Sequence, residues 1–369
     1  MNMRWSLFLG KVSGIGIYIH WTFWILVIWI FLMYYRSDGG LAGGLLGVLF
    51  IFALFACVVL HELGHAITAK RFKIVTKNIT LLPIGGLANM ERLPDKPGQE
   101  LLVAIMGPMV NVVIAIILYL VLHLTGMLPS MEELQAIQEA EQATLAGSYF
   151  LFNLMVVNVI LVVFNLIPAF PMDGGRVLRA LLSYSFDRAK ATNIAARIGH
   201  FLAILFVFAG FYTNFWLVFI GIFIFLGAGG EANYETARSI VSNYKVKDVL
   251  MTQFTLLSPQ DTLAAAVKSL LDGQEQEFLV GEDGTVQGVL TRNNIIEGLS
   301  EFGKKTPLST VMRKDFMVLK PEMELEDVMQ KMMTSGYTIS PVIDNARLIG
   351  IVNTENINEL IMVNKAMAK

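Results

Sequence analysis

Long apolar runs are the feature that most constrains the fold of this chain. A helix needs about 20 mainly apolar residues to cross a bilayer. Four runs reach that length, at residues 17–35, 41–68, 101–124 and 149–170. A fifth run, residues 198–230, is interrupted near its middle by Thr213 and Asn214, which favours a hairpin of two short spans. The sequence therefore predicts a polytopic α-helical membrane protein with about six transmembrane helices.

Charged residues are distributed unevenly along the chain. Residues 1–230 hold 25 of the 58 Asp, Glu, Lys and Arg residues, whereas the shorter segment 231–369 holds 33. This difference predicts a lipid-embedded domain at 1–230 followed by a water-soluble region. The net charge is −2, and neither segment has the basic excess of a nucleic-acid-binding protein, so nucleic acid is excluded as a partner. Cys57, the single cysteine, rules out an intramolecular disulfide and a multi-cysteine metal cluster.

Basic residues flank the predicted spans asymmetrically. Thirteen Lys and Arg residues, from Arg4 to Arg197, fall in segments that six spans place on the N-terminal side, and Arg92 is one of them. The opposite side carries Arg36 alone, and its acidic loop around Glu139 has no basic residue. Cytoplasmic loops of membrane proteins are enriched in Lys and Arg. We therefore expect a multi-pass protein of the cell membrane with both termini in the cytoplasm.

The soluble region contains an internal repeat. An offset of 62 residues pairs Pro259 with Pro321, Gly288 with Gly350, and Asn294 with Asn356. Each copy has the pattern of a strand, a helix, two short strands and a closing helix. The pattern predicts one pseudo-symmetric α+β unit with modules at 245–304 and 305–369, preceded by a linker helix at 231–244.

The second apolar run ends in the sequence HELGH, which contains His61, Glu62 and His65. Residues four apart on a helix lie one turn apart on the same face, so both imidazoles can bind one Zn²⁺. Glu62 lies beside them and is a candidate general base. Ionisable residues within a membrane span are costly and usually functional, which favours a metal site over two histidines that merely occupy a helix.

Catalytic zinc takes three protein ligands and leaves the fourth position for water. Asp173 is the candidate third ligand, because the fourth run ends near it in FNLIPAFPMDGGR and approaches the same side of the membrane as His61. Pro168 and Pro171 end the helix there, and the two glycines after Asp173 allow the chain to turn. A simple Asp-Gly turn is the alternative, and the antiparallel HELGH neighbour favours the ligand.

These motifs resemble those of the site-2 proteases, membrane zinc metalloproteases that cut peptide bonds within or near the bilayer. HELGH matches the HExxH motif of the family, and NLIPAFPMDGG matches its second motif. Further similarity lies in IHW at 19–21, LPIGGLANM at 82–90 and GPMVN at 107–111. The C-terminal repeat is similar to a pair of cystathionine-β-synthase-type (CBS) modules. Together these features resemble the six-span subgroup of the family with a cytoplasmic CBS pair.

The resemblance implies a zinc endopeptidase that acts on membrane-spanning protein substrates. His61, His65 and Asp173 would bind one zinc per chain, Glu62 would activate water, and Asn165 would contact substrate or the oxyanion. The polar segment 73–90 resembles a membrane-associated hairpin loop of the family, which could hold a substrate in extended form; a loop lying at the headgroups is the alternative. A transporter or channel gated by the CBS pair is the competing function.

CBS pairs usually bind adenine nucleotides through a Thr or Ser and an Asp three residues later. The first copy has Thr291 but Asn294 in place of the Asp, and the second has Asn353 and Asn356 in place of both. A neutral Asn can bond a ribose hydroxyl but lacks the charge of Asp. Two uses of the pair stay open, adenine-nucleotide control and a purely structural pair that forms a homodimer or docks partners.

Overall fold

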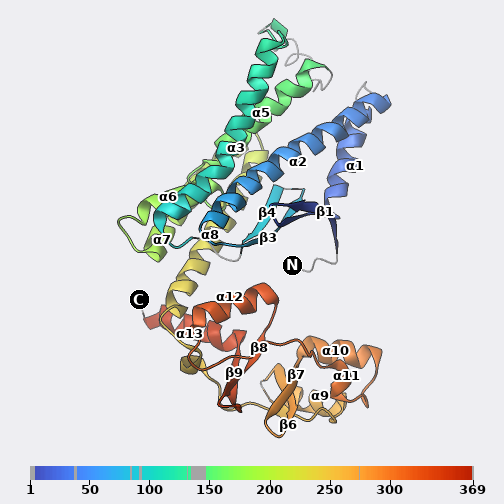
Figure 1. Ribbon diagram of the computed structural model, residues 1–369, viewed down its shortest axis with the longest axis vertical. Helices are drawn as coiled ribbons and strands as arrows, with labels where there is room; N and C mark the ends of the chain where they lie inside the picture. The colour runs from blue at the N-terminus through green and yellow to red at the C-terminus, as the bar shows by residue number, and fades with distance from the viewer. Residues whose placement is uncertain are drawn as a thin grey trace. The chain divides into compact units, whose positions relative to one another are not determined.

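The computed structural model describes residues 5–36, 40–83, 85–90, 94–130, 132–133, 147–273 and 275–367. The chain forms two compact units, unit 1 (Met1–Ala232) and unit 2 (Asn233–Lys369) (Figure 1). Arg4, Arg92 and the part of the acidic loop around Glu139 lie outside the described residues.

Unit 1 contains a four-stranded sheet in the order β1-β2-β3-β4. Strands β1 (Ser6–Val12) and β2 (Ile15–His20) form one antiparallel hairpin, and β3 (Thr76–Leu82) and β4 (Gly85–Met90) form another. Parallel pairing of β2 with β3 joins the two hairpins into one sheet. The polar segment 73–90 therefore contains the β3–β4 hairpin, and β4 forms an edge of the sheet among the described residues.

The first apolar run differs from the single span that its composition predicts. It begins as part of strand β2 and continues as helix α1 (Phe23–Tyr34), which has 12 residues. At 1.5 Å per residue α1 is about 18 Å long, shorter than the ~30 Å hydrocarbon core. Ile15 and Ile19 of β2 pack in one apolar core with Phe55 and Ile79. Alternating β-branched residues favour a strand, and apolar content alone does not reveal that alternation.

Four helices in the described part of the chain are long and apolar enough to cross a membrane. They are α2 (Gly40–Arg71), α3 (Pro97–Leu124), α7 (Arg188–Tyr212) and α8 (Trp216–Val241). Helix α5 (Ser148–Asn165) is apolar but shorter, and α6 (Asp173–Leu182) is a short helix that follows it. Many large apolar side chains on these helices are exposed, as expected for surfaces that contact lipid.

The fifth apolar run forms two helices with a break at the polar pair Thr213 and Asn214. The Thr213 hydroxyl donates to the carbonyl of Ala209 at 2.8 Å, and Asn214 Oδ1 accepts from the backbone N–H of Trp216 at 3.0 Å. The pair therefore satisfies backbone groups at the end of α7 and the start of α8. Helix α8 continues to Val241, so most of the predicted linker helix at 231–244 is the last part of α8.

Unit 2 consists of two similar modules. The first contains β5 (Leu256–Leu257), α9 (Leu263–Asp272), β6 (Glu277–Glu282), β7 (Thr285–Thr291) and α10 (Arg292–Glu301). The second contains α12 (Leu325–Ser335), β8 (Ile339–Asp344), β9 (Arg347–Asn353) and α13 (Thr354–Met367). A short helical turn lies at the start of each module, η3 (Val246–Val249) in the first and α11 (Leu308–Val311) in the second. The first strand of the second module is reduced to a parallel bridge between Leu319 and Val342.

The bridges between the modules follow the 62-residue repeat. Met251 pairs with Ile351, and Arg313 pairs with Val289. Arg313 lies 62 residues after Met251, and Val289 lies 62 residues before Ile351. The first segment of each module therefore pairs with a strand of the other module. Such reciprocal contacts are expected of two copies related by a pseudo-twofold axis.

Candidate metal centre

The HELGH sequence places two histidines on the buried face of α2. His61 and His65 are 6% and 2% exposed, and their Nε2 atoms lie 3.2 Å apart. Asp173, the first residue of α6, points its Oδ2 at both rings, 3.3 Å from Nε2 of His61 and 3.0 Å from Nε2 of His65. The structure thus brings together three metal-ligating side chains that are separated by up to 112 positions in the sequence.

The geometry of this cluster fits Zn²⁺. A tetrahedral zinc ion with bonds of about 2.0–2.1 Å holds neighbouring ligand atoms about 3.3 Å apart. The three separations in the cluster are 3.0, 3.2 and 3.3 Å. Two imidazoles and one carboxylate are a common catalytic donor set for zinc, and a fourth position remains for water or substrate.

Residues of helix α3 contact the Nδ1 atoms of both histidine rings, on the side away from the cluster. His65 Nδ1 donates to the carbonyl oxygen of Val103 at 2.7 Å, and His61 Nδ1 lies 3.0 Å from Oδ1 of Asn111. A backbone carbonyl only accepts, so the proton of His65 is on Nδ1 and the lone pair of Nε2 faces the cluster. Partners of this kind fix the tautomer and angle of metal-binding histidines.

Asn111 is the last residue of the GPMVN motif. The structure places it fully buried against a histidine of the cluster. A polar residue at the middle of an apolar run was the available signal. The Val103 carbonyl left no signal in the sequence, because every residue carries one.

Gly107 allows α3 to approach the centre closely. A Cβ at this position would lie 2.1 Å from Nε2 of His65, far inside any non-bonded contact. Only glycine fits at this position of the GPMVN motif, because the His65 imidazole occupies the space that a side chain would need.

The turn before α6 depends on two glycines for a related reason. A Cβ on Gly174 would lie 2.2 Å from the carbonyl oxygen of Ile167, and one on Gly175 would lie 2.6 Å from the carbonyl carbon of Ala169. The chain thus folds back tightly on itself before α6 begins. The two glycines were expected to allow the chain to turn, and in the structure their missing side chains leave room for the neighbouring backbone. The result is a buried Asp173 at the first position of α6.

Glu62 lies beneath strand β4. A Cβ on Gly86 would lie 2.8 Å from Cγ of Glu62 and 3.3 Å from its Oε1. The sheet edge formed by β4 therefore passes directly over the candidate base, next to the histidine cluster on the same helix.

Asn165 occupies the last position of α5 and is partly buried. Its Nδ2 donates to the carbonyl of Leu161, one turn earlier in the same helix, at 2.9 Å. One N–H of this amide is therefore used locally, and the structure records no bond from Asn165 to the histidine cluster among the described residues.

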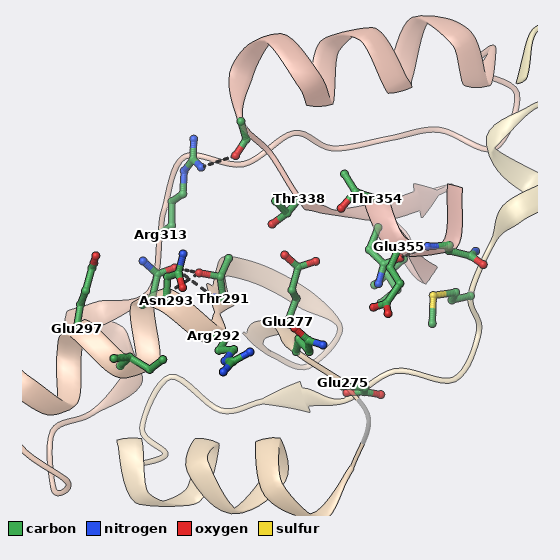
Figure 2. A pocket seen from close by; sticks show the side chains of 18 of the residues that line it. Glu275, Glu277, Thr291, Arg292, Asn293, Glu297, Arg313, Thr338, Thr354 and Glu355 are labelled. Atoms are coloured by element: carbon green, nitrogen blue, oxygen red, sulfur yellow. Dashed lines mark hydrogen bonds between the residues drawn. The ribbon is translucent and has the colours of Figure 1, made fainter. Parts of the chain in front are cut away.

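A second candidate site is a cleft of about 800 Å³ between the two modules of unit 2 (Figure 2). All four positions singled out in the sequence line it, namely Thr291, Asn294, Asn353 and Asn356. Thr291 and Asn294 bond each other as a helix cap, with 2.8 Å between the hydroxyl and Oδ1. Asn353 caps the helix of the second module in the same way, accepting from the N–H of Asn356 at 2.8 Å.

The lining of this cleft carries more negative than positive charge. Five glutamates line it against two arginines, and Figure 2 shows that they come from both modules. Burial raises the pKa of the Glu277 carboxyl, and the nearby Glu355 carboxylate raises it further. The cleft is therefore less favourable for polyphosphates than its shape suggests.

Comparisons with known proteins agree with the metal centre and with the repeat. Peptidase family M50 matches residues 49–206, and the CBS domain matches residues 246–301 and 308–363. A zinc metalloprotease of Methanocaldococcus jannaschii is 32% identical over 356 residues, which cover 96% of this chain and 96% of the relative. The chain belongs to the site-2 protease family.

The chain is also similar to one more named protein and to a solved structure. Stage IV sporulation protein FB of Bacillus subtilis is 24% identical over 256 residues, covering 67% of this chain and 82% of that protein. The solved site-2 protease from Methanocaldococcus jannaschii is 36% identical, covers 62% of this chain and 95% of that chain, and has a TM-score of 0.44.

The predicted family, zinc cofactor and enzyme class are confirmed by these relationships. The protein is a zinc metalloendopeptidase with a helical site-2 protease fold and a C-terminal CBS pair. The competing prediction of a transporter or channel gated by the CBS pair receives no support from them.

Proposed function

We propose that this protease cleaves membrane-spanning proteins at a zinc ion held by His61, His65 and Asp173. The proposal rests on one observation above all, the convergence of these three ligand atoms within 3.3 Å of one another beside Glu62. Zinc, when bound there, polarises the scissile carbonyl and acidifies water.

Glu62 performs the proton transfers in this proposal. Its carboxylate accepts the proton of the attacking water and passes it to the nitrogen of the departing amine. Its neighbours His61 and His65 keep their Nε2 lone pairs turned to the ligand position through their bonds to α3. Asn165, at the end of α5, would bind the substrate or the oxyanion with the part of its amide not bonded to Leu161.

Two substitutions separate the ligand and base roles. Glu62→Ala should keep about one zinc per chain and lose cleavage, whereas Asp173→Ala should lose both. The exposed His123 on α3 provides a control, because His123→Ala removes an imidazole outside the cluster and should change neither. Full cleavage by Glu62→Ala, or retention of tightly bound zinc by Asp173→Ala, contradicts the assignment.

The edge strand β4 is proposed to hold the substrate. A helical substrate shields its own peptide bonds and has to become extended before water can attack. Among the described residues the outer edge of β4 pairs with no strand, so it can supply backbone hydrogen bonds to such a segment, and the strand itself lies against Glu62 at Gly86. A proline scan of β4 removes its backbone N–H donors one at a time and should raise KM for a membrane-embedded reporter, and unchanged KM would instead assign β4 to the headgroup region.

We propose that six helices, α1, α2, α3, α5, α7 and α8, lie in the membrane with both termini in the cytoplasm, although α1 by itself is shorter than the hydrocarbon core. The four long apolar helices, the two shorter ones and the excess of basic residues on one side support this topology. The single buried Cys57 makes labelling practicable. In a Cys57→Ala background, Ser130→Cys should react with an impermeant maleimide in intact cells, and Thr285→Cys only after permeabilisation. The reverse pattern contradicts this topology.

The cleft of unit 2 is proposed as a regulatory ligand site. Its volume and its cap residues Thr291 and Asn353 favour a nucleoside, and its excess of glutamates disfavours a long phosphate chain. Titration of the full-length protein should therefore show adenosine or AMP binding more tightly than ATP. If adenosine, AMP and ATP all fail to bind, and if sedimentation shows a dimer that is lost when the CBS pair is removed, the structural role of the pair is favoured instead.

A further inference from the structure

Arg179 is the largest fully buried side chain in the described part of the protein. It lies on α6, six residues after Asp173. Six residues turn a helix by about 240° and advance it by about 9 Å, so the two side chains leave α6 in different directions. Asp173 points at the histidine cluster, while Arg179 points at carboxylates of two other helices.

Every arm of the Arg179 guanidinium is engaged. Its Nε donates to Oε1 of Glu100 at 2.8 Å, and Nη2 donates to the same oxygen. Nη1 donates to Oε1 of Glu231 on α8, and the guanidinium carbon lies 5.1 Å from the centre of the Phe170 ring. Because Glu100, Glu231 and Phe170 all contact this planar guanidinium fork, its position and orientation are fixed.

The other oxygen of Glu100 extends this cluster to a second arginine. Glu100 is 2% exposed, and its Oε2 accepts from Nη1 of Arg188 at 2.9 Å. The cluster thus joins two arginines to the carboxylates of Glu100 and Glu231. A buried ion cluster is a weak source of stability, because desolvation of the charges offsets their attraction. Its better-attested use is to fix one arrangement of the elements that it joins.

The elements joined are the ones that carry the metal ligands and their supports. Glu100 lies in the first turn of α3, the helix whose Val103 carbonyl and Asn111 amide orient His65 and His61. Arg179 lies on the helix that begins with Asp173. The Arg179–Glu100 bond therefore sets the rotation and height of α6 against the same helix that orients the two histidines.

We propose that Arg179 is the positioning residue that aligns Asp173 with the histidines at the metal centre. This inference rests on the proposed ligand role of Asp173. Without the fork, α6 can rotate or slide relative to α3, and the carboxylate oxygen leaves the common position 3.0–3.3 Å from both imidazole nitrogens.

Cobalt-substituted full-length protein provides the test, because the visible absorption of Co²⁺ reports the geometry of its ligands independently of cleavage. Arg179→Met and Arg179→Lys should shift this spectrum. Both should also release zinc to a chelator about 10–100-fold faster than wild type, the usual effect of removing a residue that supports a metal ligand. Arg179→Lys keeps the positive charge and loses the planar fork.

Arg188→Met is the matched control. It also removes one positive charge and hydrogen bonds to both oxygens of Glu100, but Arg188 belongs to α7 and not to the helix of Asp173. Its cobalt spectrum should equal that of wild type. An unchanged spectrum and chelator release rate in both Arg179 variants would overturn the inference, and so would failure of both to fold, which would make Arg179 a folding residue.

Asp173→Ala distinguishes this inference from the function on which it rests. If Asp173→Ala loses zinc while the Arg179 variants bind it as wild type does, the positioning role alone fails. If Asp173→Ala binds zinc as wild type does, the ligand assignment fails and the positioning role fails with it.

Discussion

Replacement of Gly107 by alanine tests whether the close approach of α3 is needed for the metal centre. The new Cβ would lie 2.1 Å from Nε2 of His65 and 2.4 Å from its Cε1. Non-bonded contacts of this kind essentially never fall below 3.0 Å. Either the imidazole or the whole of α3 would therefore have to move by about 1 Å.

Neither movement leaves the centre intact. The His65 side chain is 3% exposed and is bonded to the Val103 carbonyl on α3, so a shift of the ring breaks that bond. A shift of α3 instead carries Val103 and Asn111 away from both histidines. Overpacking of this kind costs about 1–3 kcal/mol. A displacement of 1 Å at an active site commonly lowers the rate by about 100-fold.

We therefore expect Gly107→Ala to fold, to bind zinc at least tenfold more weakly, and to lose about 100-fold in kcat. Zinc per chain after dialysis against a chelator and cleavage of a membrane-embedded reporter are the two measurements. Gly230→Ala is the control, because a Cβ there has no atom within 4 Å and alanine suits a helix. Wild-type zinc content and cleavage in Gly107→Ala would refute the packing argument.

Three further outcomes are expected. Asn111→Leu removes the partner of His61 Nδ1 and should weaken zinc binding about 10–100-fold in chelator competition, and wild-type affinity would contradict this role. Gly86→Ala should displace Glu62 and lower cleavage at least tenfold while one zinc per chain is retained; loss of the zinc would show that the strand acts elsewhere. Burial raises the pKa of Glu277 above its ordinary 4.5, so the folded state favours the protonated acid, and the stability this confers is lost as pH rises through the raised pKa. Hydrogen exchange of β6 should show this pH dependence in wild type and not in Glu277→Gln, and equal profiles would exclude it.

The local parts of the site follow from the sequence alone. HELGH predicts two histidines and a glutamate on neighbouring faces because the helical period is fixed at 3.6 residues per turn. Asp173 was predicted as their partner from the direction of the apolar runs, and the structure places its Oδ2 3.0 Å from His65. The 62-residue repeat likewise predicts the two modules, and the reciprocal bridges between them keep that offset.

Tertiary structure decided what depends on contacts between distant segments. Composition predicts a span at residues 17–35, but pairing of β2 with β3 makes its first part a strand. The carbonyl that orients His65 and the space that Gly107 leaves for its ring are properties of helix packing. The sequence determined which chemistry the protein carries, because zinc ligands need particular side chains. The structure determined how those side chains are held, because any backbone group or close contact can do so and none has a signature in a single sequence.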